Sequence, residues 1–209
     1  ATMYILAFLG AWNQFPVLLG EKGLLPAKGF LDRVPFTKMP SLFHGHYSDN
    51  FLRAVAGVGL VLSSLFLVGL MDFAPLWLWV VGWPLLWVLY LSIVNIGQRF
   101  YSFGWESMMI EAGFFTTFTS PAWVEDSLIP IFLLRWMLFR VELGAGLIKL
   151  RGDPCWKDFT CLMYHHETQP LPNSLSHFFH FMPAWFHKAG VGFSHFVQLI
   201  APFGLFLPQ

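Results

Sequence analysis

Residues 73–98 read FAPLWLWVVGWPLLWVLYLSIVNIGQ and contain no Asp, Glu, Lys or Arg. An α-helix rises about 1.5 Å per residue, so about 20 apolar residues cross a hydrocarbon core of about 30 Å. Residues 1–20, 54–71 and 189–209 also lack these four residue types. Because charged side chains are costly inside a bilayer, these runs predict a chain that crosses a membrane several times.

The composition excludes a single water-soluble domain. Charged residues make up 11% of the 209 residues and hydrophobic residues 56%, whereas soluble domains have about 25% charged residues. The formal net charge is zero, so the surplus of Lys and Arg that nucleic-acid binding requires is missing. We therefore expect a lipid bilayer and bound lipids around the chain, and neither a nucleic-acid partner nor a cofactor.

The fold class that follows is all-α, a polytopic membrane helix bundle with five or six transmembrane helices in a single domain, 1–209. The fourth predicted span, 104–119, is barely long enough to cross the bilayer, and it either crosses or re-enters on the same side. The polar stretch 20–50 lies outside the lipid. The predicted spans are about 3–19, 51–71, 76–95, 104–119, 128–149 and 189–207.

The basic residues of the predicted loops give one expectation about orientation. In a six-span arrangement they all fall on one side, which the positive-inside rule assigns to the cytoplasm, or to the matrix of a mitochondrion. The opposite side carries Asp72, Glu125 and Asp126. The basic residues on the side assigned to the cytoplasm or matrix are Lys22, Lys28, Arg33, Lys38, Arg53, Arg99, Arg151, Lys157 and Lys188.

Span five is unusual because it carries several charges. Arg135, Glu142 and Lys149 recur every seven residues and so form one polar stripe along a helix, which faces protein rather than lipid. We favour internal neutralisation, in an intramembrane charge network with Glu111 and Arg140. The alternative is a buried site for a substrate or an ion.

The two cysteines, Cys155 and Cys161, are the only ones in the chain. Pro154 starts an irregular turn that brings their Cα atoms toward the spacing of about 5.5 Å that a disulfide needs. Such a bond requires an oxidising compartment. The alternative is a metal site. We do not expect one, because the spacing of the candidate ligands matches no standard zinc pattern. Its ligands would be Cys155, Cys161, His165, His166 and Glu167.

Motifs for nucleophilic catalysis are missing from the sequence. There is no Gly-x-Ser-x-Gly turn and no zinc-protease helix, and Ser, His and Asp are too scattered to indicate a triad. We therefore predict no catalytic residues and no enzyme activity. The contrary hypothesis is a membrane enzyme that acts on a lipid or quinone with Lys149 or Glu111 as the base.

Four stretches carry a family resemblance: KGLLP (22–26), VNIGQRFYSFGWESMMIEAGF (94–114), GAGLIKLRGDPCWKDFTC (144–161) and HETQPLPN (166–173). Together they resemble the lipase maturation factors nearly from end to end. The resemblance implies a chaperone or scaffold of the endoplasmic reticulum that homodimeric lipases need, not a hydrolase. The family-motif or partner-binding residues that it implies are Gly104, Trp105, Glu106, Ser107, Glu111, Lys149, Arg151, Gly152, Asp153, Cys155, Trp156, Asp158, Cys161, His165, Glu167, Thr168, Gln169 and Pro170.

Two departures from the family pattern shape the functional expectation. His166 stands where relatives carry an aromatic residue, and the chain ends after the last predicted span, whereas family members continue into a large folded region. We expect a non-catalytic membrane protein that assists folding or assembly of a lipase client. The alternative is a structural accessory subunit of a larger membrane complex, for example a respiratory complex in the mitochondrial inner membrane.

The resemblance and the loop charges disagree about orientation. The resemblance places the loop of Cys155 and Cys161 in the lumen, whereas the distribution of Lys and Arg places it on the cytoplasmic or matrix side. Both orientations, and both five and six spans, stay open from the sequence.

Overall fold

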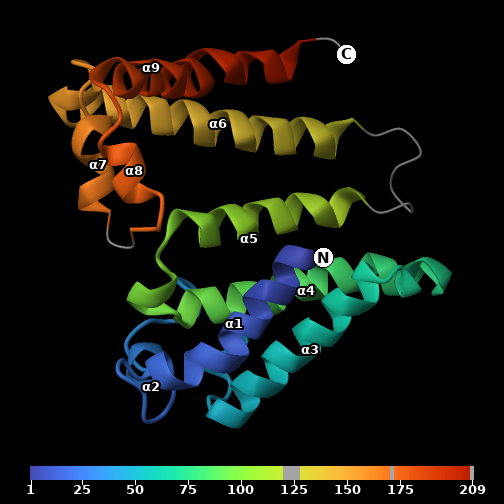
Figure 1. The fold of residues 1–209 in the computed structure, drawn as a ribbon. Coiled ribbons are helices and arrows are strands. Elements are labelled where there is room, and N and C mark those ends of the chain that lie inside the picture. Colours follow the sequence, from blue (N-terminus) through green and yellow to red (C-terminus); the bar gives the residue numbers. More distant parts are fainter. Residues whose placement is uncertain (120–127, 170–171, 208–209) are drawn as a thin grey trace. The chain divides into compact units, whose positions relative to one another are not determined.

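The computed structural model describes residues 1–119, 128–169 and 172–207, and within these ranges its regular structure is entirely helical (Figure 1). It divides into two compact units, Ala1–Pro130 and Ile131–Gln209, which are described separately below. The predicted all-α membrane class is confirmed. The single domain 1–209 stays a prediction.

The first unit is built from three long helices that pack on one another. Large apolar side chains of α1 lie in its core, and Phe8, Phe15 and Leu19 are fully buried there. Gly59 allows α1 and α3 to approach closely, because a Cβ atom at this position would lie 2.4 Å from the Phe8 ring. The elements are α1 (Thr2–Leu19), α2 (Ala27–Leu31), α3 (Asp49–Leu67), α4 (Leu76–Ile96) and α5 (Gly104–Thr116), with short 3₁₀ turns at Leu42–His44, Leu70–Phe73, Gln98–Tyr101 and Thr117–Thr119.

The polar segment between α1 and α3 is tied at both of its ends. The Tyr47 hydroxyl donates a hydrogen bond to the Leu19 carbonyl at 3.0 Å, and the Glu21 N–H donates to the Asp49 carboxylate at 2.9 Å. Ser48 caps α3 by accepting a hydrogen bond from a backbone N–H in the first turn. The end of α1 and the start of α3 therefore lie next to each other.

The second unit consists of two long helical segments and a group of short helices. Gly146 of α6 lets the segment after α9 approach, because a Cβ atom there would lie 2.6 Å from the Leu199 side chain. The elements are α6 (Ile129–Arg151), a 3₁₀ turn (Pro154–Trp156), α7 (Leu162–Thr168), α8 (Ser176–His180) and α9 (Ala184–His195), which continues through a π turn (Phe196–Ile200) into a 3₁₀ turn (Ala201–Phe206).

In the described part of the chain, four helical segments are long and apolar enough to cross a bilayer. They match four of the predicted spans and support an integral membrane protein in a lipid bilayer. Their bounds are Thr2–Leu19, Asp49–Leu67, Leu76–Ile96 and Ala184–Phe206.

Two charges were assigned to loops wrongly. The last span begins at Ala184 rather than at 189, so Lys188 lies inside the helix. Pro183 precedes this helix, a position that proline favours because it lacks an N–H to leave unpaired. Arg53 was counted with the loops although it lies within the predicted span 51–71, and it occupies the second turn of α3, which starts two residues earlier, after the Ser48 cap.

The other two predicted spans are helices whose crossing stays a prediction. Helix α5 has 13 residues, fewer than the about 20 that a crossing helix needs. Helix α6 has 23 residues and is long enough to cross a bilayer, but its charged side chains distinguish it from the four apolar segments.

Candidate functional site at the disulfide loop

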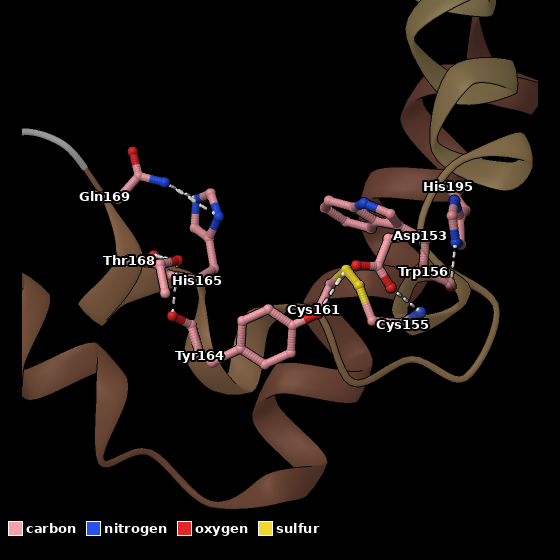
Figure 2. The surroundings of a disulfide bond; sticks show 9 residues. All are labelled: Asp153, Cys155, Trp156, Cys161, Tyr164, His165, Thr168, Gln169 and His195. Atoms are coloured by element: carbon pink, nitrogen blue, oxygen red, sulfur yellow. Dashed lines mark hydrogen bonds between the residues drawn. A yellow bond between two sulfur atoms is a disulfide. The ribbon is translucent and has the colours of Figure 1, made fainter.

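Cys155 and Cys161 form a disulfide bond, as predicted, with their Cα atoms 4.7 Å apart (Figure 2). The Asp153 carboxylate accepts a hydrogen bond from the Cys155 N–H at 2.9 Å, which starts the turn. The Cys155 carbonyl accepts from the N–H groups of Thr160 and Cys161. Phe159 turns the chain with a φ of 60°. Residues 153–161 thus form a closed loop, which we call the disulfide loop.

The bond decides between the two hypotheses for the cysteines. Both sulfur atoms are used in it, so neither is a free thiolate that could bind a metal. Within the described residues, no group of three or more His, Cys, Asp or Glu side chains is arranged to hold a metal ion. The cysteines are 8% and 6% exposed, so the bond is shielded from solvent.

Lys149 connects the end of α6 to the disulfide loop and to α9. Its ammonium group donates a hydrogen bond to the Ser194 hydroxyl at 2.8 Å and lies 4.5 Å from the centre of the Trp156 ring. An ammonium group over an aromatic face is attracted by the ring electrons. Lys149 therefore has one partner on the loop and another on α9.

His195 makes the second connection between the loop and α9. Its Nε2 atom lies 2.9 Å from the Trp156 carbonyl oxygen (Figure 2), and its ring contacts those of Trp156 and Phe159. The sequence reasoning did not single out Ser194, His195 or Phe159. The available indication was that His195 belongs to the histidine-rich segment after residue 164.

The predicted residues of α7 make mostly local contacts. The Gln169 amide lies 2.8 Å from His165 Nε2, and the Thr168 hydroxyl donates to the Tyr164 carbonyl at 3.1 Å. The Tyr164 hydroxyl oxygen lies 3.8 Å from the Cys161 sulfur atom. The Tyr164 contact holds the start of α7 next to the disulfide, and the Thr168 and Gln169 contacts close the other end of the helix (Figure 2).

A histidine cluster joins α7, α8 and α9, and we define it as His166, His180 and His187. The ring centres of His166 and His187 are 6.1 Å apart, and His187 Nε2 lies 3.3 Å from the His180 carbonyl oxygen. Glu167 approaches His180 to 3.6 Å. Burial lowers the pKa of His166, and the neighbouring His165, His187 and His180 act in the same direction.

The remaining predicted residues of the second unit are placed as follows. Arg151, Gly152 and Asp158 are exposed, and the Gly152 N–H donates to the Ile148 carbonyl where α6 ends. Pro170 lies outside the described residues.

The other predicted motif begins α5 in the first unit. Gly104, Trp105 and Ser107 are exposed, and the Trp105 ring stacks on that of Phe103 with centres 4.8 Å apart. Glu106 differs, because its carboxylate accepts a hydrogen bond from the Tyr90 hydroxyl of α4.

The predicted charge network spans both units and stays a prediction as a whole. Glu142 and Lys149 lie two turns apart on α6, and Arg135 and Arg140 precede them on the same helix. Glu111 lies on α5.

These features define a class: a polytopic membrane protein that is helical in its described residues, with a disulfide-closed loop that contacts the segment Ala184–Phe206. The family model for the lipase maturation factor transmembrane domain matches residues 1–209, and the chain belongs to this family.

Curated relatives agree with the family match. Lipase maturation factor 1 of Mus musculus is 43% identical and that of Homo sapiens 41%, each over 99% of this chain and 39% of the relative. Lipase maturation factor 2 of Xenopus tropicalis is 32% identical over 99% of this chain and 31% of its own length. The chain thus spans well under half the length of these relatives. No solved structure matches it.

Proposed function

We propose that this chain is the membrane part of a non-catalytic maturation factor that assists folding or assembly of a lipase client. The family match and the printed names of the relatives support this proposal. Because the chain spans only part of the relatives' length, we assign it a limited role. It presents the extramembrane faces of 94–114 and 150–173 to client or partner proteins.

The observation that carries the proposal is the way the disulfide loop is held. Lys149, Asp153 and both cysteines have internal partners, so they fix the shape of a surface. A loop held by a covalent bond and by contacts to two helices is preorganised for recognition, which lowers the entropic cost of binding.

The same contacts disfavour the hypothesis of a membrane enzyme with Lys149 as the base. A general base must reach the proton that it removes. Lys149 lies over Trp156 and donates to Ser194 instead, and this arrangement is that of a structural cation.

We also propose that the disulfide loop faces the lumen of the endoplasmic reticulum. A disulfide persists in an oxidising compartment, and the lumen is one. The loop charges favour the opposite orientation, because basic residues near the ends of membrane helices count toward the positive-inside rule, and we give the disulfide more weight.

The test replaces Trp156 in the complete protein that contains these residues. In cells without their own lipase maturation factor 1, we expect Trp156→Ala to lower the activity of a secreted homodimeric lipase about fivefold, because Lys149 and His195 lose their contacts with the Trp156 ring. Trp156 is partly buried, and loss of a cation–π contact of this kind costs about 1 kcal/mol, enough to loosen the loop. The matched control is Trp185→Ala in the same unit, where the side chain is 70% exposed and activity should not change.

Co-purification in mild detergent provides the second readout. The proposal requires the lipase client among the retained proteins, with less of it retained by Trp156→Ala. Retention of respiratory or other complex subunits without any lipase would replace the proposal with the accessory-subunit hypothesis.

A further inference from the structure

A groove in the first unit runs along one face of α1. Leu6, Gly10, Gln14 and Leu18 line it, and their four-residue spacing places them in one row about 18 Å long. The groove has a volume of about 250 Å³. Its α1 wall is apolar except for the Gln14 amide, which lies near the end of the helix.

The opposite wall is aromatic and acidic. Tyr90, Phe100, Tyr101 and Glu106 line it, and the Tyr90 hydroxyl donates a hydrogen bond to the Glu106 carboxylate. Burial and then the nearby Glu106 raise the pKa of Tyr101, so its phenol stays protonated and can donate. In the described part of this unit, no Lys or Arg forms an ion pair with Glu106.

The depth of Glu106 makes this arrangement informative. Helices α1 and α4 are two of the apolar segments that can cross a bilayer, and Tyr90 lies six residues before the end of α4 at Ile96, about 9 Å along the axis. The carboxylate that bonds to Tyr90 is therefore held at membrane depth. An acidic side chain there is costly, and such residues face a cavity or a partner.

We propose that this groove binds a membrane lipid with an ammonium headgroup, such as phosphatidylethanolamine. The ammonium group pairs with the Glu106 carboxylate beside the aromatic rings, which also attract cations. The acyl chain lies on the apolar α1 wall. The negative charge of Glu106 disfavours a lipid with a purely anionic headgroup, and the apolar wall gives a lipid an advantage over a small soluble amine.

The first test measures binding of phosphatidylethanolamine that carries a fluorophore on its acyl chain. With the complete chain in detergent micelles, we expect saturable binding by fluorescence anisotropy. Glu106→Gln still accepts the hydrogen bond from Tyr90 but has no charge, so affinity should fall about tenfold. The matched control is Glu21→Gln, an exposed position of the same unit, which should bind as the unchanged protein does.

Two ligand comparisons separate the possible sources of the ammonium group. Phosphatidylglycerol with the same label should bind about tenfold more weakly, because it lacks the cation. Free ethanolamine in large excess should leave the labelled lipid bound. Equal binding of phosphatidylglycerol, or displacement by ethanolamine, overturns the assignment to an ammonium lipid.

The second test fills the groove without removing any contact. A Cβ atom at Gly10 meets nothing within 4 Å, so Gly10→Leu places its side chain in the open groove and should abolish lipid binding. Gly29→Leu is the control, because a Cβ atom there also meets nothing within 4 Å. Circular dichroism should be the same for both variants. The proposal fails if Gly10→Leu or Glu106→Gln keeps the affinity of the unchanged protein.

Discussion

The two units of the molecule are stabilised by different kinds of contact. The first unit buries large apolar side chains completely, among them Phe8, Phe15 and Leu86. In the described part of the second unit, the apolar side chains in the buried class are Val191, Pro202 and the two disulfide-bonded cysteines. The second unit depends on its disulfide, on Lys149 and on hydrogen bonds of its histidines. We infer that packing defects damage the first unit most, whereas reduction and acidification act on the second.

The largest expected effect comes from a cavity in the first unit. Phe8→Ala removes a ring that is fully buried and that fills the space left by Gly59, so it should destabilise the unit by about 4 kcal/mol. Hydrogen exchange of α1 and α3 should accelerate strongly, with no change in the disulfide loop. Met3→Ala on the same helix is the control, because Met3 is 70% exposed. Equal acceleration in both units would contradict the comparison.

A smaller effect is expected from opening the disulfide. Replacing both Cys155 and Cys161 with Ala should destabilise the second unit by about 2 kcal/mol, the chain-entropy value for so short a loop. Hydrogen exchange should rise in residues 153–161 and in α9, where His195 loses its fixed partner. A reducing agent should have the same effect on the unchanged protein and no effect on the double variant. Faster exchange in α1 would argue against separate sources of stability.

The smallest expected effect is a pH dependence of the second unit. The pKa of His166 is lowered in the folded state. At pH values between this lowered pKa and the ordinary histidine pKa of about 6.5, the unfolded chain therefore binds more protons than the folded chain does. The free energy of unfolding is therefore highest above a pH of about 6.5, and it decreases as the pH falls through this range.

His166→Phe should flatten this pH dependence, as measured by hydrogen exchange of α7 and α9 at pH values on both sides of the window. His46→Phe is the control, because His46 is exposed and lies in the first unit. A pH dependence that survives His166→Phe unchanged would assign the effect to other groups.

The sequence predicted the apolar spans well, because the requirement for uncharged residues acts on each helix by itself. The start of α3 was also readable, since Ser48 and Asp49 form a typical helix start. The start of α9 was readable from Pro183. The start of α9 was missed because lack of charge was used as the criterion for a span, and this excluded Lys188 from the helix that contains it.

The candidate site was predictable only in part. The pairing of Cys155 with Cys161 follows from local turn geometry. The contact of Lys149 with Ser194 joins residues that are 45 positions apart, and no local pattern in the sequence predicts which helix passes the end of α6. The partnership of Glu106 with Tyr90 is a tertiary contact of the same kind, although the two residues are only 16 positions apart.

The tied ends of the polar segment between α1 and α3 have a consequence for how the chain can vary. The bonds from Tyr47 to Leu19 and from Glu21 to Asp49 hold the ends together, and within the segment Phe43 is buried and Ser41 donates a hydrogen bond to the Ser92 carbonyl of α4. The exposed stretch 35–39 is the part that is free to lengthen, and doubling the length of a flexible connection costs about 0.6 kcal/mol in closure entropy. An inserted epitope or fluorescent label should therefore be accommodated in 35–39 with both flanking membrane helices left in register.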